Sequence, residues 1–337
     1  MTDHTLDELI KLLGNRQNAG NKVYVQTHNF PDPDAIASAY GMQKLLSHFG
    51  VDADICYHGD IDRVNTRKML ELLKIRMYSK HELEDVMRED DPIICVDSQK
   101  EGGNILDMTG DEVACVDHHP TVKKIDYFYK DVRIVGSCAT IITDYFRKLE
   151  VPLDEMTATA LLYGLKMDTL GFSRGVKEQD IDAFAYLYRQ ADNDLLTSLE
   201  RNQLMFNDLD AYGAAISGVE VYGNLGISRI PFSCPDALIA IVSDFLLSLD
   251  EVEVVVVYSI REDGYKFSTR SEVKKVDAGK LVANALRGIG NGGGHSFMAG
   301  GFAGKEQIQS LGTDPDYELR NRFLDALNMG VKRDGSF

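Results

Sequence analysis

Three short apolar runs in the first half of the sequence each lead directly to acidic or imidazole side chains. Val23–Val25 leads to His28, Asp32 and Asp34, Pro92–Val96 leads to Asp97, and Val113–Val116 leads to Asp117, His118 and His119. Segments with helical spacing alternate with the strand-like runs, a pattern typical of a parallel sheet with helices on both faces. Ligands of such sheets bind beyond the carboxyl ends of the strands. The sequence therefore predicts an α/β fold with a mostly parallel N-terminal sheet and one site at its edge.

The loop after the first apolar run is predicted to be stiff and to lead into a helix. Pro31 and Pro33 fix φ at their own positions and push Phe30 and Asp32 toward extended geometry. The next segment has apolar residues at helical spacing, and Asp34 is predicted to be its N-cap. A stiff loop with one imidazole and two carboxylates suits a metal ion with nitrogen and oxygen ligands. The alternative for Asp34 is that it only caps the helix.

Further segments complete an N-terminal domain. Helices are predicted at 5–13 with a Thr5–Glu8 capping box, at 67–73, from Ser137, and from Asp154 or Thr157, and a further strand at 53–57. The helix from Asp154 or Thr157 leads to Asp168, another acidic position. Residues 178–206 have a mostly helical, polar pattern and are predicted to contain the interdomain connection. The predicted division is a domain at 1–188, a helical linker at 189–214 and a domain at 215–337.

The second half of the chain changes toward hairpins. Turn signals lie at Gly223–Asn224 and Asp263–Gly264, each between strand-like runs, and helices are predicted at 235–248 and 277–287. These elements predict a smaller α+β domain. Its glycine-rich stretch 288–295 would let backbone N–H groups approach an anion closely. A flexible turn explains the same glycines equally well.

Charge and cysteine content narrow the class of protein. The 337 residues carry a formal charge of −17, which disfavours a broad basic face for long duplex nucleic acid. The 5 cysteines show no Cys-x-x-Cys spacing and are predicted to be buried thiols in a reducing compartment. The N-terminus lacks the pattern of a signal peptide, and Asp244 and Glu253 interrupt the longest apolar stretches. A cytoplasmic protein without membrane spans is expected.

The polar clusters resemble, in their order, the motifs of the DHH phosphoesterase superfamily. The matching motifs are His28-x-x-x-Asp32-x-Asp34, Asp97, Asp117-His118-His119, Asp168 and, in the second domain, Gly292-Gly293-Gly294-His295. The tripeptide at 117–119 is the one that names the family, and the glycine motif is similar to that of its DHH-associated domain. The resemblance covers about residues 20–305. The layout is most similar to the branch that degrades nanoRNA and dephosphorylates pAp.

This resemblance implies a centre of two divalent ions, usually manganese, with magnesium, cobalt or zinc as alternatives. Carried over by position, His28 and Asp32 would bind one ion, Asp34, His118 and Asp168 the other, and Asp97 both. Such a pair of ions activates a shared water and clamps the phosphoryl oxygens, so no protein nucleophile is needed. His119 would face the substrate phosphate, and Asp117 would orient neighbouring ligands.

The resemblance also implies a substrate-binding group in the second domain. Arg270 and Ser271 resemble a strand-end Arg-Ser that contacts substrate phosphate, and an arginine suits that role because it binds phosphate bidentately. The motif Gly292–His295 would complete a clamp that faces the metals across an interdomain cleft. The implied partners are short nucleotides or other small phosphorylated molecules, and relatives commonly pair as homodimers. Phe30 departs from the polar or basic residue that relatives often carry, and is either core or a stacking surface.

Two other functions remain open from the sequence. A pyrophosphatase or exopolyphosphatase would use the same ions, but the Ser-Arg-Lys cluster of the related pyrophosphatases is absent from the sequence. A non-catalytic nucleotide sensor would be marked by the loss of a metal ligand, and none is lost. A soluble enzyme that finishes a linear dinucleotide is a further form of the leading hypothesis.

Overall fold

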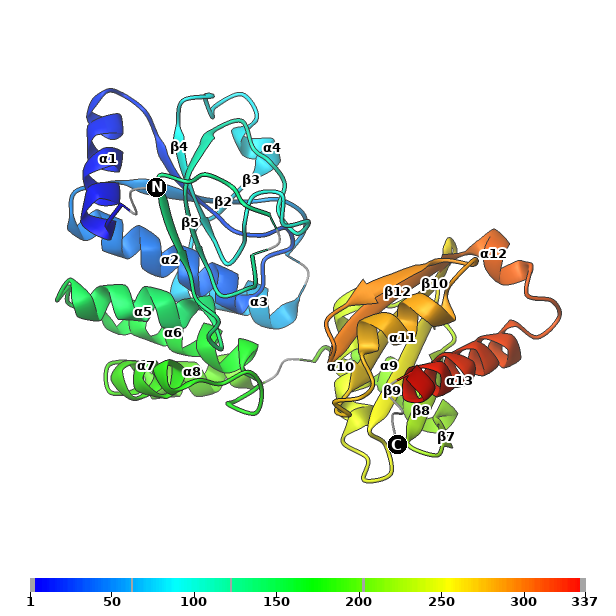
Figure 1. The fold of residues 1–337 in the computed structure, drawn as a ribbon. Helices are drawn as coiled ribbons and strands as arrows, with labels where there is room; N and C mark the ends of the chain where they lie inside the picture. Colours follow the sequence, from blue (N-terminus) through cyan, green and yellow to red (C-terminus); the bar gives the residue numbers. More distant parts are fainter. Residues whose placement is uncertain (1–3, 62, 122, 202–203, 334–337) are drawn as a thin grey trace. The chain divides into compact units, whose positions relative to one another are not determined.

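The computed structural model describes residues 4–61, 63–121, 123–201 and 204–333 of the chain (Figure 1). The chain divides into two compact units, Met1–Gln203 and Leu204–Phe337. The division falls inside the segment 189–214, which the sequence analysis assigned to a linker. Helix α8 (Asn193–Glu200) packs into the core of the first unit, and α9 (Asp208–Gly218) packs into the second.

The first unit contains a six-stranded parallel sheet of order β3-β2-β1-β4-β5-β6. Its strands are β1 (Val23–Gln26), β2 (Ala53–Tyr57), β3 (Tyr78–Ser79), β4 (Pro92–Val96), β5 (Asp111–Asp117) and β6 (Tyr129–Val132). The predicted α/β fold is confirmed. The two outermost strands, β3 and β6, were not predicted, because they are short and carry polar residues at the edges of the sheet.

Most helices of the first unit lie where the sequence predicted them, but the helix predicted at 67–73 begins three residues earlier, at Val64, and the short helix Lys80–Leu83 was not predicted. They are α1 (Leu6–Asn18), α2 (Pro33–His48), α3 (Val64–Leu73), α4 (Lys80–Leu83), α5 (Cys138–Lys148), α6 (Glu155–Asp168), α7 (Glu178–Tyr188) and α8. The capping box at Thr5 and Glu8, the N-cap Ser137 of α5 and the N-cap Asp154 of α6 are confirmed. The predicted cap of α2 is wrong, because its N-cap is Asp32 and not Asp34.

The position of the α2 cap has a direct physical cause. The carboxylate of Asp32 accepts from the backbone N–H groups of Asp34 and Ala35 at 3.0 and 3.1 Å. Pro33 then occupies the first helical position, where its missing N–H group costs nothing. Asp34 therefore lies inside the first turn, and its side chain is available for contacts outside its own helix.

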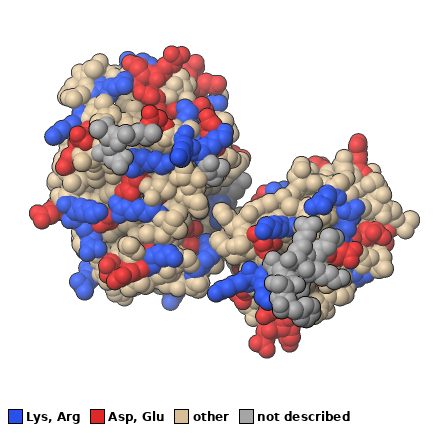
Figure 2. All heavy atoms as spheres, in the orientation of Figure 1, with Lys and Arg blue, Asp and Glu red and all other residues tan. Residues whose placement is uncertain are grey.

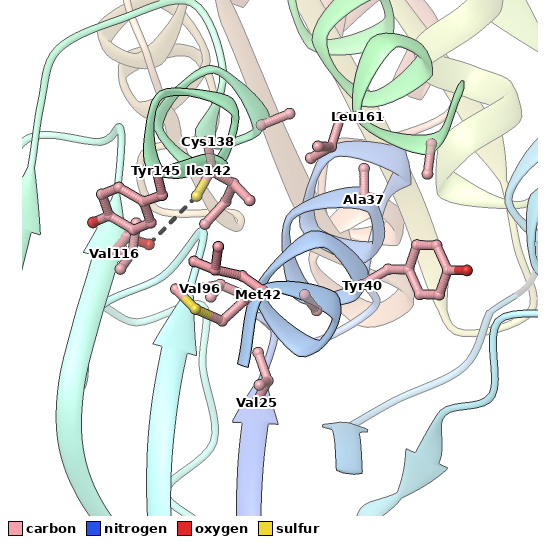
Figure 3. Close-up of a cluster of buried hydrophobic side chains, with 14 of the residues drawn as sticks. Val25, Ala37, Tyr40, Met42, Val96, Val116, Cys138, Ile142, Tyr145 and Leu161 are labelled. Atoms are coloured by element: carbon pink, nitrogen blue, oxygen red, sulfur yellow. Dashed lines mark hydrogen bonds between the residues drawn. The ribbon is translucent and has the colours of Figure 1, made fainter. Parts of the chain in front are cut away.

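The main core of the first unit lies on one face of the sheet, beneath α2, α5 and α6. Figure 3 shows side chains of strands β1, β4 and β5 meeting those of the three helices, with the Cys138 thiol bonded to the Val116 carbonyl. Tyr24, Cys56, Ile93 and Cys95 lie in a smaller core cluster, to which α4 contributes Leu83. Both faces of the sheet are thus covered, as predicted.

A glycine allows close approach of α2 and α6. A Cβ atom on Gly164 would lie 2.8 Å from the Cβ of Ala37 and 3.1 Å from the Cα of Asp34. The first distance is shorter than real Cβ contacts and the second is tighter than most of them, so a side chain at position 164 would push the helices apart. The contact holds the end of α6, which carries Asp168, against the start of α2, which carries Asp34.

The second unit is a mixed six-stranded sheet of order β11-β12-β10-β9-β8-β7, in which β8 and β9 are parallel and the other pairs antiparallel. Its further elements are β7 (Glu220–Tyr222), β8 (Leu225–Ile230), α10 (Asp236–Leu247), β9 (Val254–Ile260), β10 (Gly264–Ser271), α11 (Ala278–Ala285), β11 (Asn291–Gly294), β12 (Met298–Gly304), α12 (Lys305–Gln309) and α13 (Pro315–Arg333). Helices α9 and α10 cover one face, and α11 and α13 the other. Both predicted hairpins and the α+β class are confirmed.

The glycine-rich stretch differs from the expected loop. Asn291–Gly294 forms edge strand β11, which pairs with β12 in register from Asn291↔Phe302 to Gly294↔Ala299. A Cβ on Gly292 would lie 3.0 Å from Val282 of α11, and one on Gly294 would lie 2.6 Å from Ala299. Close packing of the strand against α11 and β12 therefore explains two of these glycines.

The cysteines, the helices and the surface charges of the described residues bear on the class of protein that the sequence predicted. All 5 cysteines are buried and free, as predicted. Among the described helices, none is both long and apolar enough to cross a membrane. On the face drawn in Figure 2, Lys and Arg side chains are interspersed with Asp and Glu and with uncharged residues.

Candidate metal centre

Asp97 lies at the carboxyl end of β4 and is central to the site. It is 2% exposed, and its backbone is left-handed, with φ of 55°. This conformation is uncommon for a residue other than glycine and is found preferentially at functional positions. Its Oδ2 lies 3.6 Å from Nε2 of His28, and its Oδ1 lies 3.2 Å from Nε2 of His118. The two oxygens of one carboxylate thus face two different imidazoles.

The two imidazoles are oriented by backbone carbonyls. Nδ1 of His28 lies 2.8 Å from the carbonyl oxygen of Asn29, and Nδ1 of His118 lies 3.1 Å from that of Val135. Because a carbonyl only accepts, each Nδ1 carries the proton and donates it. In the neutral ring Nε2 is then left with a lone pair, which is the arrangement of a metal-binding histidine.

Asp34 reaches across to the start of a different helix. Its Oδ2 accepts from the N–H of Cys138 at 2.7 Å, and its Oδ1 accepts from the N–H of Ala139 at 3.0 Å. These are unpaired N–H groups of the first turn of α5, where a carboxylate also interacts favourably with the helix dipole. Each oxygen has two acceptor positions, so the carboxylate keeps capacity for a cation.

Ligand-type atoms of these residues gather in three overlapping groups, each within 4.8 Å. The groups are His28, Asp32 and Asp97; Asp34, His118 and Asp168; and Asp97, His118 and His119. The first two groups contain all six residues predicted to bind metal. Asp97 belongs to the group with His28 and Asp32, where its Oδ2 faces His28, and its Oδ1 faces His118 of the group with Asp34 and Asp168. The six residues therefore lie close enough to bind two ions. Which residue binds which ion stays a prediction.

The DHH tripeptide contributes a second hydrogen-bonded group. Oδ1 of Asp117 accepts from the N–H groups of His118 and His119 at 2.7 and 3.1 Å, and lies 2.9 Å from Nδ1 of His119. Its Oδ2 accepts from Nε2 of Gln99 at 2.7 Å, and the same amide group donates to the His119 carbonyl at 3.1 Å. Asp117 therefore orients the tripeptide, and it holds the His119 ring with Nε2 turned away from this bond. The side chain of His119 is 40% exposed.

Burial and neighbouring charges shift the pKa values of several residues in the cluster. Burial opposes the charge of His28, but contact with Asp32 and the charge of Asp97 raise its pKa to about 10. Burial likewise opposes the charge of His118, but contact with Asp97 and the charge of that carboxylate raise the pKa of the imidazole well above its usual value. Burial and the charge of Asp97 raise the pKa of Asp34 well above its usual value. Burial and the charge of Asp32 raise the pKa of Asp168 to about 6, against the opposing effect of His118.

The residues present fit divalent cations. Oδ1 of Asp97 and Nε2 of His118 are buried and have no hydrogen-bond partner among the described residues, although they lie 3.2 Å apart. Two buried polar atoms that face each other without a bond indicate a missing shared partner. Four carboxylates and two imidazoles suit hard and borderline divalent ions, and a cation would replace the protons that the raised pKa values retain.

Two residues behind the ligands were not found from the sequence. Asp180 of α7 is 0% exposed, and its oxygens accept from the N–H of Gly136 at 2.8 Å, the N–H of Lys177 at 2.7 Å and the Thr140 hydroxyl at 2.6 Å. Arg174 donates to the Asp168 carbonyl at 2.7 Å. The local sequence does not reveal the role of Asp180, because Gly136 and Thr140, which it binds near the ligands, lie 44 and 40 residues away along the chain.

Asp180 supports the segment that positions two ligands. Residues 135–140 supply the carbonyl that holds His118 and the N–H groups that hold Asp34, and Asp180 binds Gly136 and Thr140 of the same segment. A Cβ on Gly136 would lie 2.7 Å from Oδ2 of Asp180, so the approach requires glycine there.

The predicted substrate residues of the second unit also group together. Arg270 pairs with Met298 in the β10–β12 register, and the N–H of Ser271 donates to the Phe297 carbonyl at 3.0 Å. The turn from Gly294 through His295 thus lies at the same end of the sheet as Arg270 and Ser271. Within this unit Nε of Arg270 donates to Asp244 at 2.5 Å, and its Nη1 donates to the Ser268 hydroxyl at 3.0 Å. A role in phosphate binding stays a prediction.

Comparison with known families assigns the chain. A profile of the DHH family, N-terminal domain, matches residues 22–165, and a profile of the DHHA1 domain matches residues 223–327. The chain belongs to the DHH phosphoesterase superfamily. The DHH match contains the motif residues from His28 to His119, and the DHHA1 match contains Arg270 and the Gly292–His295 motif.

Individual relatives of this DHH protein differ in their named activities. An uncharacterized protein of Methanocaldococcus jannaschii is 30% identical over 279 residues, 82% of this chain and 56% of that protein. The cyclic-di-AMP phosphodiesterase GdpP of Bacillus subtilis is 23% identical over 333 residues, 91% of this chain and 48% of that enzyme. A probable manganese-dependent inorganic pyrophosphatase of Bacillus cereus is 27% identical over 254 residues, 72% of this chain and 79% of that protein. The chain spans about half the length of the first two relatives.

A solved structure has the same fold over the whole chain. An exopolyphosphatase-related protein from Bacteroides fragilis matches with a TM-score of 0.74 and 18% identity, and the match covers 98% of this chain and 100% of that one. At this identity the likeness concerns the fold alone, and activity has to be argued from the site.

Proposed function

We propose that the chain is a metal-dependent phosphoesterase that hydrolyses short oligoribonucleotides or pAp. The observation that carries the proposal is the shared carboxylate of Asp97, whose two oxygens face His28 and His118 at 3.6 and 3.2 Å. A carboxylate in this position suits two divalent ions, most simply Mn²⁺. When bound, a pair of such ions supplies an activated water and charge stabilisation for displacement at phosphorus.

The residues of the chain have distinct parts in this proposal. His28, Asp32, Asp34, Asp97, His118 and Asp168 hold the ions. His119 offers an imidazole at the exposed side of the site, and contact with Asp117 raises its pKa against the effect of burial. A protonated imidazole there donates to the phosphate or to the departing oxygen. Arg270, Ser271, His295 and the glycines 292–294 are proposed to bind the substrate, and the protein is proposed to act on short molecules as a homodimer.

The relatives favour phosphate chemistry but divide on the substrate. The GdpP relative is named for a cyclic dinucleotide, which is consistent with a nucleotide substrate or a linear dinucleotide. The pyrophosphatase relative covers 72% of this chain and supports inorganic pyrophosphate as a second candidate. A non-catalytic sensor is the third candidate, and the complete set of ligands counts against it.

One set of assays separates the three candidates. The protein is purified, stripped of metal with a chelator and reloaded with Mn²⁺, and turnover of pAp, a 5′-phosphorylated RNA dinucleotide and pyrophosphate is measured side by side. We expect mononucleotide from the first two substrates and no hydrolysis of pyrophosphate. Hydrolysis of pyrophosphate alone would overturn the substrate assignment, and no turnover of any of the three would favour the sensor.

A further inference from the structure

Phe30 occupies an unusual position between two ligands of the metal centre. It lies two residues from His28 and two from Asp32, and it is 61% exposed. Its φ is 55°, in the left-handed region, although Pro31 follows it and the sequence predicted extended geometry. That prediction was wrong because the N–H of Phe30 donates to the carbonyl of His58 at 2.8 Å, which fixes the turn.

This conformation is costly, and the side chain is only partly buried in return. A bulky residue in the left-handed region is an outlier that costs about 1–2 kcal/mol. A side chain with a purely structural role recovers such a cost by burial, but most of this ring is open to solvent. Strained backbone conformations cluster at active sites and ligand clamps, and this one lies between two residues of the metal centre.

The ring rests against the backbone of a glycine. A Cβ on Gly59 would lie 2.6 Å from Cδ1 and Cε1 of Phe30, so the ring rests directly on the Gly59 backbone. Gly59 itself has φ of 88°, a second position where glycine is favoured. The contact limits the movement of the ring, and 61% of the residue stays exposed.

We propose that Phe30 is the platform on which a nucleobase of the substrate stacks while the adjacent phosphate lies at the metal centre. This inference rests on the proposed function and specifies its substrate as a molecule that carries a base next to the scissile phosphate. Two residues of chain reach at most about 7 Å, which is comparable with the span from phosphate to base within one nucleotide. Pyrophosphate has no group that an aromatic face would bind.

Kinetic tests use the contrast between base-bearing and abasic substrates. Stacking of one base on an aromatic side chain corresponds to about a 5- to 150-fold effect. We expect Phe30→Ala to lower kcat/KM for a 5′-phosphorylated RNA dinucleotide by a factor in this range, mainly through KM. The loss with the abasic analogue of the same dinucleotide should be much smaller. Phe30→Leu separates stacking from simple apolar cover, because leucine keeps the cover and lacks the aromatic face.

A binding test does not depend on turnover. The chain contains no tryptophan, so Phe30→Trp places a single tryptophan at the proposed platform, and its fluorescence can be excited selectively at wavelengths that the tyrosines do not absorb. AMP is expected to quench this fluorescence saturably, both with Mn²⁺ and after chelation, though more weakly after chelation. Phe49→Trp is the matched control, because Phe49 is also exposed, at 42%, and caps the far end of α2. The 16 residues of α2 place it about 24 Å from the start of the helix, and it should not respond.

The outcomes distinguish this inference from the proposed function. Suppose that the wild-type protein cleaves the dinucleotide. If Phe30→Ala then lowers kcat/KM equally for the dinucleotide and its abasic analogue, or if Phe30→Leu retains full activity, the stacking platform is refuted and the proposed phosphoesterase function stands. If AMP quenches the tryptophan fluorescence of Phe30→Trp but no nucleotide is cleaved, the platform stands and the proposed phosphoesterase function is refuted. Equal quenching at positions 30 and 49, or none at either, refutes the platform.

Discussion

Removal of the Asp180 carboxylate tests whether a residue without direct contact to the metals controls their binding. Asp180 accepts three hydrogen bonds, at 2.6, 2.7 and 2.8 Å, in a fully buried position. At about 1.5 kcal/mol for each bond to a charged group, Asp180→Ala loses about 4–5 kcal/mol. Relief from burying the charge returns part of this, so we expect a net destabilisation of about 3 kcal/mol.

The effect on metal binding is the more specific prediction. Asp180 holds the segment whose carbonyl orients His118 and whose N–H groups orient Asp34, so the ligands should lose their arrangement. Changes to residues that orient ligands typically lower metal affinity by about 10- to 100-fold. The measurements are urea unfolding of the metal-free protein and calorimetric titration with Mn²⁺. Thr140→Val removes one of the three bonds to Asp180, together with the 3.1 Å bond between the Thr140 and Ser137 hydroxyls, and is expected to give a smaller change in the same direction.

Asp154→Ala is the matched control. Asp154 is an N-cap aspartate of the same unit, accepting from the Thr157 N–H at 2.9 Å, and it lies at the opposite end of α6 from Asp168. Its loss should cost about 1 kcal/mol of stability and leave Mn²⁺ affinity unchanged. The reasoning would be refuted if Asp180→Ala stayed folded with wild-type Mn²⁺ affinity, or if both variants lost affinity in proportion to their lost stability.

Two further predictions concern the ligands themselves. Asp97→Asn should abolish turnover and reduce the amount of bound Mn²⁺ measured by elemental analysis, since an amide cannot bridge two cations as a carboxylate does; wild-type activity would exclude the assigned centre. The raised pKa of Asp168, about 6, means that the folded metal-free protein holds this proton more tightly than the unfolded chain does. The stability this proton provides is complete below about pH 4 and is lost as the pH rises through 6. Asp168→Asn lacks this dependence, so its stability relative to the wild type should increase from pH 4 to pH 7. Thermal unfolding of the metal-free proteins measures this difference, and a difference that stays constant with pH would contradict the assignment.

The tertiary structure corrected the sequence analysis where a contact partner lay far away along the chain. Asp34 was predicted as a cap of its own helix, yet its carboxylate binds Cys138 and Ala139, more than a hundred residues later. Phe30 was predicted to be extended, because the rule for residues before proline takes no account of the His58 carbonyl. The glycine-rich stretch was predicted as a loop, because the strand pairing that orders it comes from β12.

The sequence by itself determined the fold class, and its resemblance to the DHH phosphoesterase superfamily supplied the candidate metal-binding residues. Apolar runs such as Pro92–Val96 encode buried parallel strands, and the residues that follow them lie at one edge because all parallel strands end there. Only the tertiary structure decided how these residues are held. Orientation of His118 by the Val135 carbonyl, support from Asp180 and the exposure of the Phe30 ring all depend on contacts between distant segments, which local propensity and spacing do not specify.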